Sequence, residues 1–468
     1  MSDTPVTETD GGAIDGGAID ARGRAGATDA ARAAGVSSAT DAAAPTDAAP
    51  STTEPASDTA ATELPQPRGF YALYVLSWFG LNLALGTISG VSLPKAFAFI
   101  DDATKEVNLS IVTAVGGILV MVVTPLAGRL SDRTRSRLGI RRPWILWGSV
   151  VGFGGAVVLG LATSLMPMLV GWVILQCGLG AANAAVHAML AEQIPTRVRA
   201  RISGLASAAT GLGVILGAGI VAALPNESQW MWFVIPGAIG AVFTGLLYFR
   251  MNDVVRTEPR PPLRWTDVVS TYWISPRSAP DFFWAWICRL LVTMSTGFVS
   301  IYLLFFIIDR LGVSKETATG VQATGMAIFT LGALVTAVLF GWISDRTGRR
   351  KTIVWASCAI SVVGLSLGML ASDIPTFLIA LSIVGAAQGA FVSVDLALLT
   401  EVLPHYDDAG KDLGIVALSY QAPMFLVPAL AVPVLAIGGG HNYTALFGTA
   451  IVCGVLGGLA VFPIKSVK

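Results

Sequence analysis

The heptapeptide Gly128-Arg-Leu-Ser-Asp-Arg-Thr134 returns 213 residues later as Gly341-Trp-Ile-Ser-Asp-Arg-Thr347. A second segment, Ala188-Met-Leu-Ala-Glu-Gln-Ile-Pro195, returns after 209 residues as Ala397-Leu-Leu-Thr-Glu-Val-Leu-Pro404. The two shifts nearly agree, and each segment has the same place in its half of the chain. The sequence therefore indicates an internal duplication of the chain.

Long apolar stretches surround both motifs. Hydrophobic residues make up 54% of the chain and charged residues only 13%, against roughly 25% charged in a soluble domain. A helix needs about 20 apolar residues to cross a bilayer, and continuous apolar runs are typical of helices. The predicted fold is all-α and integral to the membrane, with twelve transmembrane helices in two six-helix bundles. The expected spans are 70–93, 107–127, 143–165, 167–190, 203–224, 230–249, 281–308, 317–342, 351–371, 374–399, 413–437 and 443–463.

Composition changes mark the segments outside the spans. Residues 1–69 carry eleven acidic and four basic side chains and show no apolar periodicity. This pattern predicts a disordered acidic cytoplasmic tail and does not match a secretory signal peptide. Bundles are expected at 70–249 and 281–468, joined by a polar, Pro-rich cytoplasmic linker at 250–280.

The short loops indicate the orientation. Loops on one side carry twenty-one Lys and Arg residues, and those on the other carry four: Lys95, Lys105, Arg310 and Lys315. Since positive loops stay in the cytoplasm, both termini are predicted there, in a multi-pass protein of the plasma (inner) membrane.

The loop after the second span carries a family resemblance. It runs Gly128-Arg-Leu-Ser-Asp132-Arg133-Thr-Arg-Ser-Arg-Leu-Gly139-Ile-Arg-Arg-Pro143. Its first part resembles the signature of the major facilitator superfamily over residues 70–463. Its longer form looks like the loop of the sucrose:proton symporters and the glycoside–pentoside–hexuronide:cation group. The resemblance implies two bundles that tilt around a central site and take up a sugar or glycoside with protons.

Two copies of the motif supply the predicted gating residues. In the first copy these are Gly128, Asp132 and Arg133, and in the second Gly341, Asp345 and Arg346. A Gly permits close helix approach, and a carboxylate at a helix end can bind a helix N-terminus or an Arg of the other bundle. The alternative is that the arginines of this loop only determine topology.

Ionisable residues within the spans are the candidates for proton coupling or substrate binding. Asp395 and Arg289 lie in spans 10 and 7, and an intramembrane carboxylate is costly. The resemblance implies that these spans line the cavity, with both residues in its cytoplasmic half, so we expect them to pair. A structural ion pair, or an Arg289 that reaches the interface, is the alternative. His187 titrates near neutral pH and stands where sucrose symporters carry an Arg linked to coupling; a packing histidine is its alternative. His405 and His441 are interpreted as solvated loop residues.

Amides within the spans are the candidates for the substrate cavity. Asn82 and Asn183 are proposed cavity residues, with Trp78, Phe79 and Trp286 as candidate stacking faces, because sugar sites combine amides with aromatic rings. Glu192 and Glu401 are assigned a structural or gating role, paired with Arg199, Arg201, Lys411 or the gating loops. The four cysteines lie far apart in apolar segments and are interpreted as buried packing residues.

Four functions are candidates for a chain with these features. The first is proton-coupled uptake of a sugar or glycoside, and the second is proton-driven export of amphiphilic compounds. An enzyme is disfavoured because no nucleophile–base or metal-ligand cluster appears, and the fourth is a sensor without flux. No P-loop occurs, so an ion gradient is expected to supply the energy and no cofactor is expected. Protons are favoured as the coupling ion, because spans 1 and 2 show no carboxylate of the kind that sodium-using relatives employ. The expected partners are a small-molecule substrate and the lipid bilayer, without nucleic acid, and the transport unit is expected to be a monomer.

Overall fold

The computed structural model describes residues 65–255, 279–401, 409–438 and 440–465. Its regular elements are all helical. The first half comprises α1 (Phe70–Thr87), the π-helical turn η1 (Ile88–Ser92), α2 (Leu93–Ile100), α3 (Lys105–Asp132), α4 (Arg142–Leu161), α5 (Leu165–Glu192), α6 (Thr196–Ala223) and α7 (Gln229–Arg250). The second comprises α9 (Pro280–Asp309), α10 (Lys315–Thr347), α11 (Arg350–Leu370), α12 (Ile374–Glu401), α13 (Ala409–Gln421), α14 (Pro423–Leu435) and α15 (Tyr443–Leu459).

These helices confirm the predicted membrane fold. Within the described residues, eleven helical segments are long and apolar enough to cross a membrane, and α15 forms a shorter twelfth apolar helix. The first span is one continuous run, 70–100, made of α1, η1 and α2, and the eleventh is made of α13 and α14. The predicted acidic tail and most of the predicted linker, at 1–64 and 256–278, lie outside the described residues.

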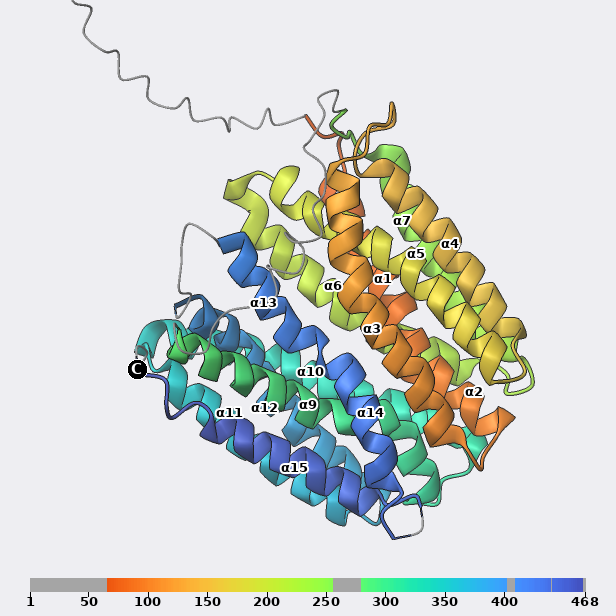
Figure 1. Ribbon diagram of the computed structural model, residues 1–468, viewed down its shortest axis with the longest axis vertical. Coiled ribbons are helices and arrows are strands. Elements are labelled where there is room, and N and C mark those ends of the chain that lie inside the picture. Colours follow the sequence, from red (N-terminus) through yellow and green to blue (C-terminus); the bar gives the residue numbers. More distant parts are fainter. Residues whose placement is uncertain (1–64, 256–278, 402–408, 439, 466–468) are drawn as a thin grey trace, which may run out of the picture. The chain divides into compact units, whose positions relative to one another are not determined.

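Figure 1 shows the helices of the first half (orange to yellow-green) and those of the second half (green to blue), and the helix contacts repeat from one half to the other. In the first half, α1 packs on α6 and α7, α4 on α5 and α7, and α3 on α5. In the second half, α9 packs on α14 and α15, α11 on α12 and α15, and α10 on α12. When the helices are numbered as membrane spans 1 to 12, each contacting pair of the first half corresponds to a pair whose span numbers are higher by six. The duplication predicted from two short motifs therefore extends to the packing of both bundles.

The two halves pack on each other at two seams, each a contact between one helix of the first half and one of the second. The duplication maps one seam onto the other. The second span, α3, packs on α14 of the eleventh span, and the fifth, α6, packs on α10, the eighth. At the first seam the backbones come close: a Cβ built on Gly117 would stand 2.6 Å from the Met424 carbonyl carbon and the Phe425 nitrogen. Glycine at 117 thus permits this approach of α3 to α14.

Backbone carbonyls at interruptions of the spans are bound by side chains of other helices. Pro94, just after η1, has no N–H to donate to the preceding turn, and the Gln322 amide of α10 donates to the Gly90 carbonyl within η1 (2.8 Å). Pro236 has no N–H for the carbonyl of Trp232, four residues earlier, and that carbonyl accepts from the Ser92 hydroxyl (2.6 Å). Such partners allow a helix to be interrupted in lipid, and the first of them links the two halves.

Candidate functional site

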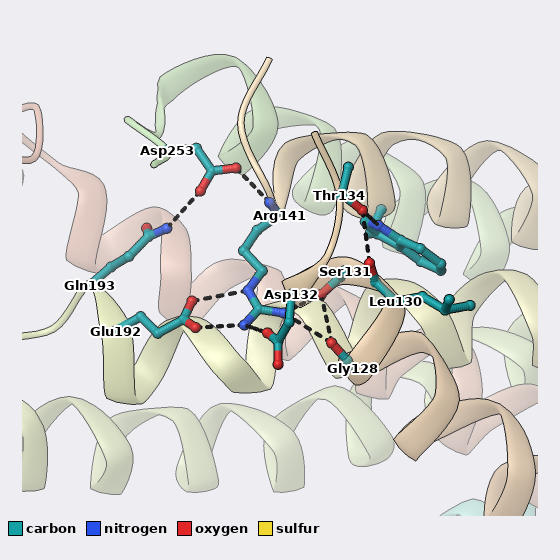
Figure 2. A network of polar contacts seen from close by, with 10 residues as sticks. Gly128, Leu130, Ser131, Asp132, Thr134, Arg141, Glu192, Gln193 and Asp253 are labelled. Atoms are coloured by element: carbon teal, nitrogen blue, oxygen red, sulfur yellow. Dashed lines mark hydrogen bonds and ion pairs between the residues drawn. The ribbon is translucent and has the colours of Figure 1, made fainter. Parts of the chain in front are cut away.

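Arg141, the residue before α4, is the centre of a polar network that joins three helices (Figure 2). Its guanidinium binds both oxygens of Glu192 at the end of α5, at 3.0 and 2.6 Å. It also binds Asp132 and the Ser131 hydroxyl at the end of α3. Arg141 is 2% exposed, so its charge is compensated almost entirely by these two carboxylates. The bidentate geometry fixes α5 relative to α3 and α4.

Asp253, just after α7, holds the other side of the same loop. Its Oδ2 accepts from the backbone N–H groups of Arg141 (2.6 Å) and Arg142 (2.8 Å), and its Oδ1 accepts from the Gln193 amide (3.3 Å). Burial raises the pKa of the Asp253 carboxyl, although these N–H donors oppose the rise. Gly139 has a φ of +108°, and a Cβ there would come within 2.3 Å of the carboxylate, so the turn requires glycine at this position.

The predicted gating motif is thus only partly as expected. Asp132 pairs with an arginine of its own bundle, and Glu192 pairs with the gating loop, one of its predicted alternatives. The close helix approach expected at Gly128 and Gly341 is wrong for this conformation, because a Cβ on Gly128 meets no atom within 4 Å and one on Gly341 meets only Ser393 at 3.8 Å.

The two copies of the motif differ in their surroundings. Asp345 and Arg346 are exposed, and Arg346 stacks on the Trp342 ring at 4.0 Å. Asp345 makes no ion pair with any residue that the structure describes, whereas Asp132 does. The gating roles of Arg133, Asp345 and Arg346 stay predictions.

A second group of predicted residues meets between α1 and α5. The rings of Trp78 and His187 lie edge to face, with centroids 4.4 Å apart. The Asn82 amide donates to the Trp78 carbonyl one turn earlier (2.9 Å). The first and fourth spans, α1 and α5, run antiparallel. Asn82 follows Trp78 by one turn and Asn183 precedes His187 by one turn, so the two amides lie at the same height along the helix pair. His187 is exposed and makes no hydrogen bond within the described part of the chain, so the hydrogen-bonded packing role is not seen.

The Arg289–Asp395 pair is confirmed. Nη1 of Arg289 on α9 lies 2.9 Å from Oδ2 of Asp395 on α12, with side chains 20% and 6% exposed. With the 209-residue shift of the second motif, Asp395 corresponds to Val186, the residue before His187. Each half therefore joins its first and fourth helices through a pair of predicted site residues at nearly the same position.

A cavity of about 160 Å³ lies between α6 of the first half and α9, α10 and α12 of the second. Three hydroxyl side chains, those of Thr296, Ser300 and Thr330, contribute to its lining. The other lining residues are apolar: Val214, Val299, Leu303, Gly325, Met326, Phe329, Leu381 and Val384. Asn82 and Asn183 are not among them.

Two predictions about the opposite end of the bundles are wrong. His441 is not simply solvated, because its Nδ1 lies 2.8 Å from Glu106 Oε1. In addition, α3 begins two residues before the predicted second span and so includes the buried carboxylate of Glu106. Lys95, counted as a loop charge, lies buried in α2 with its ammonium 4.3 Å from the centre of the Trp232 ring. These contacts join residues far apart in sequence, which single motifs do not signal.

Comparison with known proteins identifies a family. A model described as the Major Facilitator Superfamily matches residues 70–328 and 317–468. An uncharacterized MFS-type transporter of Mycobacterium tuberculosis (strain H37Rv) is 24% identical over 416 residues, which cover 77% of this chain and 58% of the relative. A probable 4-methylmuconolactone transporter of Cupriavidus pinatubonensis is 27% identical over 298 residues, 59% of this chain and 66% of the relative.

Further relatives agree with these matches. The hexuronate transporter of Bacillus subtilis is 21% identical over 287 residues, 58% of this chain and 66% of the relative. The chain thus spans about three fifths to two thirds of the length of these curated relatives. All of them are named as transporters rather than enzymes.

Solved structures share the fold. A mutant of the nucleoside transporter NupG superposes with a TM-score of 0.67 at 12% identity, covering 84% of this chain and 99% of its own. A bacterial homologue of the human lysosomal transporter Spinster, inward-facing and occupied, gives a TM-score of 0.61 at 16% identity, covering 86% and 96%.

Proposed function

The chain belongs to the Major Facilitator Superfamily, and from this premise we propose that it is a secondary active transporter that takes up a sugar or glycoside together with protons. On this proposal it works by alternating access, in which the two bundles tilt around a central site. The relatives named for hexuronate and 4-methylmuconolactone support a small polar substrate.

The observation that carries the proposal is the pair of functional side chains in each half. Trp78 and His187 meet between the first and fourth spans, and Arg289 and Asp395 meet between the seventh and tenth. An indole offers a flat apolar face for a sugar ring, and the amides of Asn82 and Asn183 offer donors and acceptors for hydroxyl groups. The first half then supplies most of the substrate contacts.

Asp395 is the proposed proton carrier. Its carboxylate is 6% exposed and faces one arginine. Protonation of Asp395 removes the negative charge that holds Arg289, and deprotonation restores the pair. A proton can thus change the contact between α9 and α12, which couples protonation to the arrangement of the second bundle. His187, exposed beside Trp78, is the second candidate.

The first experiment uses purified protein in liposomes that hold a pH-sensitive dye. Sucrose, maltose, glucose, glycosides and hexuronates are added in turn, with a proton gradient and without it. Sugar-dependent proton entry is the expected result. Folded and oriented protein that responds to none of these compounds would contradict the proposal.

Variants then test the pair. We expect Asp395→Asn to abolish proton-coupled uptake while sugar exchange continues, because the site is kept and only the titrating group is lost. The matched control is Asp373→Asn, which removes an exposed carboxylate that caps α12 through Thr376 (2.9 Å). If Arg289→Ala is inactive but the double variant Arg289→Ala/Asp395→Ala transports normally, the pair is structural and Asp395 carries no proton.

A second candidate function rests on the cavity. Most residues that line the space between α6, α9, α10 and α12 are apolar, as a site for amphiphilic compounds requires. In the same liposomes, proton movement that responds only to amphiphilic cations would favour this exporter.

A further inference from the structure

Three potential metal ligands meet at the end of the bundles opposite Arg141. Glu106 belongs to the first turn of α3, Asp309 is the last residue of α9, and His441 precedes α15. One ligand atom from each lies within 4.8 Å of the others. The cluster therefore joins the first half of the chain, through Glu106, to the second half, through Asp309 and His441.

The spacing of these atoms fits a small divalent ion. His441 Nδ1 lies 2.8 Å from Glu106 Oε1 and 3.9 Å from Asp309 Oδ2. A tetrahedral zinc site with bonds of about 2.0–2.2 Å places its ligand atoms roughly 3.3–3.6 Å apart. The two observed distances bracket this value, so shifts of about half an ångström would bring His441 to the zinc spacing from both carboxylates, which lie within 4.8 Å of each other.

Neighbouring groups already orient the ligands. The Tyr443 hydroxyl binds Glu106 Oε1 (2.9 Å) and Asp309 Oδ2 (2.5 Å), and Lys105 Nζ donates to Asp309 Oδ1 (2.6 Å). Partners of this kind fix the ligands of metal sites. The Glu106 side chain is 8% exposed and that of His441 is 50% exposed, which leaves a solvent path to the imidazole.

The charges of the cluster also favour a cation. Lys105 is shared between Asp309 and Asp102, and Lys315 lies 3.1 Å from Asp102. Three carboxylates, of Asp102, Glu106 and Asp309, thus face two ammonium groups. One negative charge remains in excess, beside a histidine that binds metal in its neutral form.

We propose that Glu106, Asp309 and His441 bind a divalent transition-metal ion of the zinc class, and that the bound ion holds the two halves together at this end and stops transport. The binding site stands on the geometry alone, whereas the block of transport rests on the proposed function. With the orientation predicted from the loop charges, the site faces the outside.

Calorimetric titration of the full-length protein with zinc chloride tests the site. One zinc ion per chain is the expected stoichiometry, with binding at least 10-fold weaker in His441→Ala and in Glu106→Gln. Tyr443→Phe should weaken binding about 10–100-fold, as the loss of a group that orients the ligands does. The matched control, His405→Ala, removes a histidine outside the described residues and should bind zinc like the wild type.

Unchanged zinc binding in both His441→Ala and Glu106→Gln would overturn the site, and so would no binding by the folded wild type. The melting temperature in detergent verifies that each variant is folded. These readouts do not depend on transport, so a protein that binds zinc but moves no sugar would refute the proposed function and leave the site standing.

Transport in liposomes tests the block. Zinc on the side of the cluster should stop uptake by the wild type and leave uptake by His441→Ala unchanged. Zinc that binds with the expected stoichiometry and does not slow transport would overturn the second part of the proposal.

Discussion

At the scale of single residues, one arginine organises each bundle: Arg141, which is buried, and Arg289, which is partly buried. Arg141 holds the ends of α3 and α5 through Asp132 and Glu192, and Arg289 holds α12 to α9 through Asp395. Burying a guanidinium is costly unless its partners are present. Removing either arginine therefore leaves carboxylates whose charge was compensated within the protein.

We predict that Arg141→Ala destabilises the protein by about 3 kcal/mol, the lower end for a broken buried pair, because its carboxylate partners are about one third exposed. The melting temperature in detergent measures the effect. The melting temperature of Arg141→Lys should lie between those of the wild type and Arg141→Ala, since lysine keeps the charge but not the bidentate contact. The control is Arg135→Ala, an exposed arginine of the same loop, and equal melting temperatures for the 141 and 135 alanine variants would refute the prediction.

The sequence predicted one of these arginines and missed the other. Arg289 is a charge within an apolar span, which is rare enough to imply a partner. Arg141 is one of six arginines in a loop whose charge is already explained by topology, so nothing in its own position marks it. His441 was missed for a similar reason, because Glu106 lies 335 residues away and the contact exists only in the folded chain.

At the scale of elements, apolar runs predicted the spans but not their interruptions. The first span contains η1, and the eleventh is divided at Ala422 between α13 and α14. Hydropathy continues through both places, whereas the helix geometry depends on prolines such as Pro94 and Pro423. Length and composition thus predict where a chain crosses the bilayer, and local backbone chemistry determines how.

The seam between α3 and α14 provides a prediction at this scale. Gly117→Ala should destabilise the protein by about 1–3 kcal/mol, as overpacking does, because the new Cβ would meet the backbone of Met424 at 2.6 Å. Gly154→Ala is the control, since a Cβ there meets no atom within 4 Å and alanine favours the helix. A melting temperature for Gly117→Ala at or above that of Gly154→Ala would show that the seam tolerates the methyl group.

At the scale of the whole molecule, the structure strengthens the charge asymmetry of the loops. Of the four positive residues counted on the less basic side, Lys95 is buried and Lys105 is bound to Asp102 and Asp309. That side therefore offers fewer unpaired positive charges than its sequence suggests. The opposite side keeps the arginines of the α3–α4 loop, of which Arg135 and Arg137 are exposed.

Cysteine labelling tests the predicted orientation, in which both termini are cytoplasmic. In a variant without the four native cysteines, a membrane-impermeant maleimide should label Ala103→Cys in intact cells. Leu138→Cys should react only after the membrane is opened. Both positions are exposed in the structure, so the difference reports the side of the membrane. The reverse pattern would invert the topology and place the zinc site inside the cell.

The link between Gln322 and the carbonyl of Gly90 has a consequence for how this protein can diverge. The acceptor is a main-chain oxygen, which every amino acid provides, and a Cβ at position 90 would meet only Met326 at 3.6 Å. Descendants can therefore replace Gly90 by alanine and keep the contact. The donor is less exchangeable, since the carboxamide of Gln322 supplies the N–H from the other half of the chain. Across species, position 322 should therefore keep a side chain that donates a hydrogen bond, while position 90 varies among small residues.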